Sequence, residues 1–123
     1  MSDADRHPAE VHAQEAAEAI RAFNHASFAI DSIDQPSTVY NILGELYTLA
    51  SRLDQAIGQL SSPLQRQLEA GRLHVDDGAP FAGEPDRAVV TAVEELGVAR
   101  ECVHDAHEAL TNAQSAISGL YAR

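Results

Sequence analysis

The stretch DRAVVTAVEELGVARECVHDAHEALTNAQSAISGLY, residues 86–121, repeats an apolar residue every seven positions. A second apolar row follows the first three residues later, and no polar residue interrupts either row. The first row is Val89, Leu96, Val103, Leu110 and Ile117, and the second is Ala92, Ala99, Ala106, Ala113 and Leu120. This pattern predicts one long helix over 86–121 with an apolar seam for a partner helix.

The partner helix is predicted upstream, over residues 37–70. Three apolar residues in every seven are typical of a helix that faces a bundle core. The two main rows are Val39, Leu46, Leu53 and Leu60, and Leu43, Ala50, Ile57 and Leu64. We therefore expect residues 37–70 and 86–121 to form a long antiparallel helical hairpin.

Three residues are expected to punctuate the 37–70 helix. Ser37 is a suitable N-cap, and Gly71 is a suitable C-cap. Pro63 has no N–H to donate to the carbonyl of Gln59, so we expect a kink or a break near residues 61–62.

The rest of the chain predicts shorter elements around this hairpin. Residues 1–7 are expected to be a disordered tail, and residues 8–29 a shorter N-terminal helix. Residues 72–85 are expected to form a loop whose Leu73, Val75 and Phe81 pack on the end of the hairpin. The predicted fold class is all-α and three-helix bundle-like, in a single helical domain over 8–123. The residues expected to be largely buried in its continuous core are Leu53, Leu60, Leu96, Val103 and Leu110.

Composition excludes several classes of function. The 123 residues carry eight Arg, no Lys and nineteen acidic residues, for a formal charge of −11. Binding to nucleic acid through phosphates needs clustered basic residues, so we expect no nucleic-acid partner. One cysteine cannot form a disulfide within the chain, and no apolar run is long enough to cross a membrane. The first residues lack the pattern of a secretory signal, so we expect a cytoplasmic protein.

The final helix contains one arrangement with the spacing of a metal site. Glu101 and His104 match the Glu-x-x-His spacing of di-iron bundles, but the motif occurs once and lies on the outer side of the seam. We expect both residues to be solvated, His107 to pack beside the seam, and Cys102 to be buried and inert. Near the N-terminus, His and Glu residues alternate without completing a tetrahedral ligand set. The sequence predicts no catalytic residue, no cofactor site and no metal site.

A row of small residues predicts an interface. Gly44, Ser51 and Gly58 are seven apart on the side of the 37–70 helix away from its Leu stripe. Glycine in a helix interior costs about 1 kcal/mol relative to alanine, so two of them suggest a close approach by another helix. Simple tolerance of exposed glycine is the alternative. The expected assembly is a homodimer that pairs one of the two long helices with its mate.

Two segments, STVYNILGELYTLASRLDQAIGQL (37–60) and DDGAPFAGEP (76–85), together with the Ala-rich final helix, carry a resemblance. Over about residues 37–121 the chain resembles a group of short all-helical proteins of unknown function from Streptomyces and related actinobacteria. The use of Arg without Lys suits such a high-GC bacterial source. The resemblance implies an all-helical fold and brings no activity, ligand or catalytic residue with it.

Three hypotheses of function follow from the sequence. The first is a non-enzymatic helical interaction protein, an adaptor or accessory subunit that self-associates through its long apolar seams. The second is an acidic regulator or inhibitor that binds a basic protein, with an affinity that falls steeply with salt. The third is a metal- or ligand-binding helical bundle, for which the sequence supplies no complete site.

Overall fold

A computed structural model describes residues 5–29 and 31–123, and these residues form helices and no strand. The all-α class is therefore confirmed. Contacts divide the chain into two compact units, of which the larger is Tyr40–Leu120 and the smaller contains the residues before Tyr40 and the last three. The single domain over 8–123 stays a prediction, and the tail predicted for 1–7 lies partly outside the described residues, at 1–4. The helices are α1 (Pro8–Ser27), α2 (Pro36–Gly58), α3 (Ser61–Glu69) and α4 (Pro85–Ala116).

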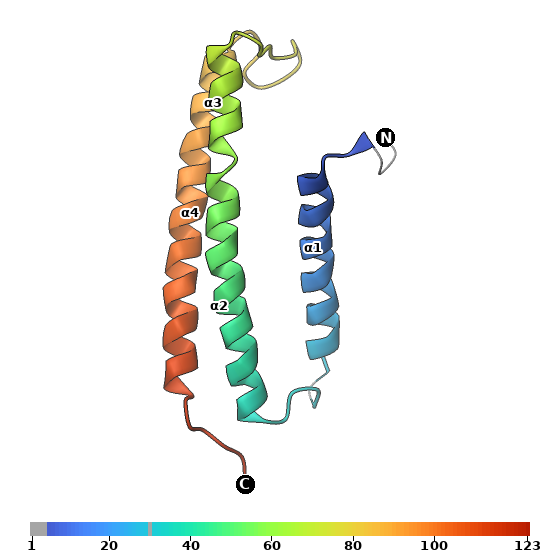
Figure 1. The fold of residues 1–123 in the computed structure, drawn as a ribbon, viewed down its shortest axis with the longest axis vertical. Coiled ribbons are helices and arrows are strands. Elements are labelled where there is room, and N and C mark those ends of the chain that lie inside the picture. Colours follow the sequence, from blue (N-terminus) through green and yellow to red (C-terminus); the bar gives the residue numbers. More distant parts are fainter. Residues whose placement is uncertain (1–4, 30) are drawn as a thin grey trace. The chain divides into compact units, whose positions relative to one another are not determined.

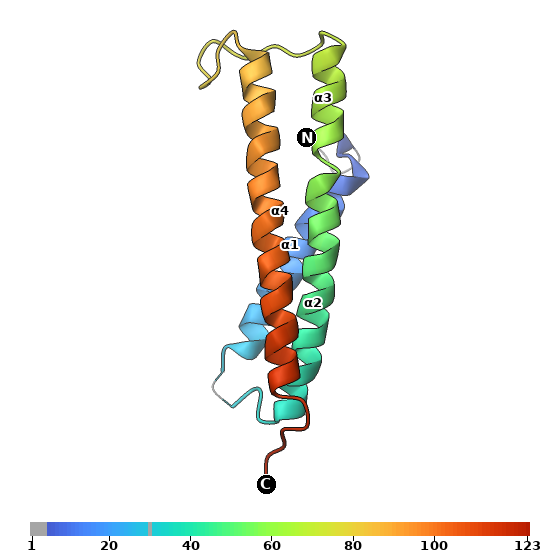
Figure 2. The ribbon, with the colours of Figure 1, turned by 90° about the vertical axis from the view of Figure 1, so that its left-hand side faces the viewer.

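The larger unit is the predicted helical hairpin. Helices α2 and α3 follow one another along one side of α4, and α4 runs in the opposite direction (Figure 1). Turned by 90°, the same arrangement shows the loop that joins α3 to α4 at one end (Figure 2). The two long segments are thus antiparallel, as predicted.

The hairpin's first side is broken where proline requires it, slightly earlier than expected. Helix α2 ends at Gly58, residues 59–60 form a turn, and α3 begins at Ser61 rather than at Pro63. Pro63 therefore occupies the third position of α3, where an N–H has no intrahelical partner to lose. The missing bond to Gln59 falls at the turn itself, which explains why the break precedes the predicted residues 61–62.

Glycines in the left-handed conformation end both sides of the hairpin. After α3, Gly71 has φ +69°, its N–H donates to the carbonyl of Leu68 (3.0 Å), and the N–H of Arg72 donates to that of Gln67 (3.1 Å). This pair of bonds is a Schellman motif and confirms the predicted cap at Gly71. The prediction that the last helix reaches residue 121 is wrong. Helix α4 stops at Ala116, and Gly119 then turns the chain with φ +80°.

The start of α2 corrects a second boundary. Ser37 is not the N-cap, because the carbonyl of Gln35 accepts from the N–H groups of Thr38 (3.1 Å) and Val39 (3.4 Å). Pro36 is the first helical residue, where its fixed φ suits the first turn.

The smaller unit contains α1, which ends at Ser27 and not at 29. The Nδ1 atom of His7 accepts the N–H of Ala9 (3.0 Å) and so caps this helix. Val11 and Phe23 are half-buried, whereas Phe28, just beyond the helix, is 89% exposed.

The prediction of a continuous buried core is wrong. Among the described residues only Ala50 and Val89 are buried; Leu53 and Leu60 are 44% and 55% exposed, and Leu96, Val103 and Leu110 are half-buried. Contacts with α4 come from the side of α2 that carries Asp54, and successive side chains on a helix point about 100° apart. Leu53 is therefore turned to one flank of the hairpin. A pair of helices buries one seam between them and leaves such a flank uncovered.

The loop between α3 and α4 folds as a series of turns. Leu73, Val75 and Phe81 are half-buried. Their packing on the end of the hairpin stays a prediction. The guanidinium of Arg87 lies over the ring of Phe81, 5.2 Å from its centroid, and also pairs with Glu84 at 3.0 Å. These contacts tie the loop to the first turn of α4.

Two helical glycines allow a matched test of the packing between α2 and α4. A Cβ at Gly97 meets no atom within 4 Å, so Gly97→Ala should stabilise the protein by about 0.5–1 kcal/mol through helix propensity alone. A Cβ at Gly44, inside α2, would lie 2.9 Å from Nε2 of Gln114. We expect Gly44→Ala to gain less than Gly97→Ala in urea unfolding, because Gln114 must move. Equal gains would contradict the close packing at Gly44.

Candidate functional site

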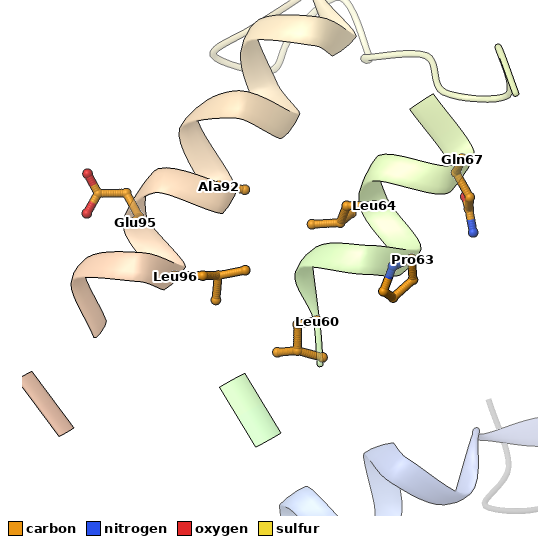
Figure 3. Close-up of a pocket in the computed structure, with 7 residues that line it drawn as sticks. All are labelled: Leu60, Pro63, Leu64, Gln67, Ala92, Glu95 and Leu96. Atoms are coloured by element: carbon orange, nitrogen blue, oxygen red, sulfur yellow. The ribbon is translucent and has the colours of Figure 1, made fainter. Parts of the chain in front are cut away.

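An apolar groove lies between α3 and α4, close to the break at residues 59–60. It has a volume of about 600 Å³, and its lining is mainly aliphatic. In Figure 3, Leu64 and Leu96 point toward one another across the space between the helices, while Glu95 points away from it. We call this the apolar groove; its lining residues are Leu60, Pro63, Leu64, Gln67, Ala92, Glu95 and Leu96.

The helix break produces this groove. Leu60 sits in the turn between α2 and α3 and is 55% exposed, so its side chain borders the groove without filling it. On the opposite wall, α4 contributes Ala92, a side chain too short to fill the space. No residue of the loop lines the groove, so the loop does not cover this part of the apolar stripe. The groove is thus a hydrophobic recess that suits aliphatic side chains, with the carboxylate of Glu95 at its edge.

The opposite side of the hairpin is polar and is held by contacts between α2 and α4. Arg100 donates from Nε to Oδ1 of Asp54 (3.1 Å) and from Nη2 to Oδ2 (3.4 Å). The ring of Tyr47 lies 4.0 Å from that of His107, centroid to centroid. We call this the polar face; it has a recess of about 110 Å³ lined by Ala50, Ser51, Asp54, Val103, His104 and His107.

The ion pair on the polar face shifts the pKa values of both partners. The hydrogen bond from Arg100 lowers the pKa of Asp54, partial desolvation opposes this shift, and the charges of Arg100, His104 and His107 reinforce it. Asp54 in turn raises the pKa of Arg100. Both side chains are partly open to solvent, at 49% for Arg100 and 39% for Asp54, so water screens the attraction.

The predicted row Gly44, Ser51 and Gly58 lies on this polar face. A Cβ at Gly44 would lie 2.9 Å from Nε2 of Gln114, and that nitrogen donates to the carbonyl of Tyr40 (3.1 Å). The close approach inferred for the two glycines is thus made by side chains of α4 in the same chain. Ser51 is exposed beside them. A role for the row as an interface between copies stays a prediction.

The structure also places the residues considered for metal chemistry. Glu101 and His104 are exposed as expected, and His104 lies 3.9 Å from Glu108 across one helical turn. His107 is half-buried against Tyr47, as expected for a packing residue. Cys102 is exposed, so its predicted burial is wrong: it lies on the flank of α4 that no helix of the hairpin covers. In residues 5–29 and 31–123, no three His, Cys, Asp or Glu side chains are placed to hold a metal ion.

Sequence reasoning missed both the apolar groove and the Asp54–Arg100 pair. Pro63 predicted the helix break. The recess beside Leu60 and Leu64 could not be predicted from it, because the recess also depends on the position of α4. A signal for the ion pair was present in the sparse charge of the 37–70 helix. Asp54 lies seven residues after Tyr47, and both contact α4.

Comparisons with protein-family models, with curated proteins and with solved structures give no match to this chain. Within the part of the chain that the structure describes, no helix is both long and apolar enough to cross a membrane.

The ion pair predicts a specific pH response. Because the pKa of Asp54 is lowered in the fold, the pair stabilises the hairpin at neutral pH, and this contribution is lost as the pH falls through the lowered value. Arg100→Gln should return the pKa of Asp54 toward its ordinary value in an NMR titration of the carboxyl carbon. It should also reduce the stability lost on acidification.

Arg66→Gln is the matched control for this prediction. It removes the same charge from an exposed position on α3 and should leave the titration of Asp54 in place. An identical shift in both variants would show that net charge, and not the pair, sets the pKa of Asp54.

Proposed function

We propose that this protein is a non-enzymatic helical interaction protein, an adaptor or accessory subunit that self-associates, and that it acts in the cytoplasm. The observation that carries the proposal is the small amount of apolar surface the hairpin buries. Among the described residues only Ala50 and Val89 are buried, while Leu49, Leu53 and Leu60 are exposed along one flank of the hairpin. Contiguous apolar surface on a folded protein is characteristic of a site for another protein.

Three of the exposed aliphatic residues share one flank of the hairpin. Leu53 and Leu60 are exposed and seven apart, Leu49 is exposed four residues before Leu53, and Leu46, seven residues before Leu53, is half-buried. Leu60 belongs both to this row and to the lining of the apolar groove. We call the combined set the apolar face: Leu46, Leu49, Leu53, Leu60, Leu64, Ala92 and Leu96. Burying a leucine side chain contributes about 1.5–3 kcal/mol, so a partner on this face gains substantially from a few residues.

A second candidate function has its own observation. The outer side of α4 exposes Glu94, Glu101, Asp105 and Glu108, and the chain carries a net charge of −11. This acidic side suits a regulator that binds a basic protein. Such binding weakens steeply as salt screens the charges, whereas binding through the apolar face does not.

Site-specific photo-crosslinking tests the proposed function. A photoreactive side chain in place of Leu60 should give a discrete crosslinked product in the cells that make the protein, because position 60 lies in the interface. Val98 supplies the matched control: it is 51% exposed, close to the 55% of Leu60, but it lies on the outer side of α4.

We expect crosslinks to a second chain from position 60 and none from position 98. Products from position 98 alone, lost at high salt, would favour the acidic regulator. No product at position 60, or only a crosslink within one chain, would overturn the proposal of an interaction surface there.

A further inference from the structure

We infer that the apolar face is covered by a second copy of this chain, so that two hairpins pack face to face as a four-helix core with two-fold symmetry. This inference rests on the proposed function, to which it adds the surface through which the chain self-associates and the symmetry of the pair. The size of the face, the placement of charge and the shape of the face support it independently.

The size of the face fits a stable dimer. Helix α4 has 32 residues and is about 48 Å long, and two helices side by side are roughly 20 Å wide. The whole flank of the hairpin that contains the apolar face therefore has an area of roughly 960 Å², enough for the ~800 Å² that each partner buries in a standard interface. The chain's own α1 has 20 residues and is about 30 Å long, which is enough for the stretch from Leu46 to Leu64 but shorter than the whole flank.

The placement of charge allows two acidic chains to meet. The exposed Glu94, Glu101 and Asp105 surround Val98 at spacings of −4, +3 and +7, which places them together on the outer side of α4. At the apolar groove the single charged residue is Glu95. Like charges therefore stay away from the contact in a face-to-face pair. A basic partner, in contrast, finds little complementary charge on this face.

The shape of the face combines projecting side chains with a recess. Leu53 and Leu60 project from the hairpin, being 44% and 55% exposed. The apolar groove beside them is open and lined by Leu64 and Leu96. In a two-fold interface the projecting residues of each copy meet the recess of the other, as knobs meet holes in a coiled coil.

Sedimentation equilibrium over a wide range of concentrations tests the inference on the full chain. The wild-type protein should have twice the 13.2 kDa chain mass. Leu53→Asp with Leu60→Asp should raise the dimer dissociation constant by more than about 100-fold, the loss expected for buried hot-spot residues. The matched control, Val90→Asp with Val98→Asp, changes two residues of similar exposure, 52% and 51%, and should leave the dimer intact.

The possible outcomes separate this inference from the proposed function. A wild-type monomer at every concentration, or equal weakening by both double variants, overturns the second copy. If position 60 then crosslinks to a different protein, the role as an interaction protein stands and its self-association through this face does not. If it crosslinks only within its own chain, α1 or another segment of that chain covers the face and both proposals fail.

A second measurement keeps the test decisive if the Leu53→Asp, Leu60→Asp protein loses its helical circular dichroism. Isotopically light and heavy copies carrying the photoreactive side chain at position 60 are mixed and crosslinked. Crosslinked peptide pairs of mixed isotope content show a dimer through this face. Pairs of a single isotope type overturn it.

Discussion

Two helices that lie side by side can bury only the side chains along one line of contact. The other features of this structure follow from that small buried area. In the hairpin, the side of α2 that carries Asp54 faces α4, and the only residues with buried side chains in the described part of the chain are Ala50 and Val89. The Leu53 row, turned about 100° away, has no third helix of the hairpin to cover it. The hairpin is therefore a folded element with an incomplete core, and its aliphatic flank carries the proposed function.

The two sides of the seam have separate roles. On the polar face, Asp54 with Arg100 and Tyr47 with His107 fix the register of α2 against α4 through contacts that only one alignment permits. Gly44 and Gly58 let the side chains of Gln114 and Arg100 cross the seam. These interactions are individually weak because they are partly solvated. Their value lies in alignment, since apolar seams of Leu and Ala tolerate shifted registers.

The break at residues 59–60 links local covalent chemistry to the candidate site. Pro63 lacks the N–H that would continue the α2 ladder, so the chain turns, and Leu60 moves to the edge of a recess walled by α3 and α4. A continuous helix presents side chains at regular intervals. The turn instead combines a projecting Leu60 with the open apolar groove, the combination that a self-complementary interface uses.

The sequence alone determined the all-α class, the hairpin, the existence of a break before Pro63 and the cap at Gly71, because each depends on spacing or on the backbone chemistry of one residue. The start of α2 at Pro36 and the end of α4 at Ala116 were harder to predict, since several nearby residues satisfy the same local rules. Only the tertiary structure decided which apolar row faces α4, that Gly44 and Gly58 receive side chains of the same chain, and that Leu53, Leu60 and Cys102 stay open. A heptad pattern determines which residues share an apolar stripe on a helix. When the stripe is wider than one line of contact, the pattern does not determine which of its rows faces the partner helix. Contacts between distant residues decide this, such as the pair Asp54–Arg100, 46 positions apart.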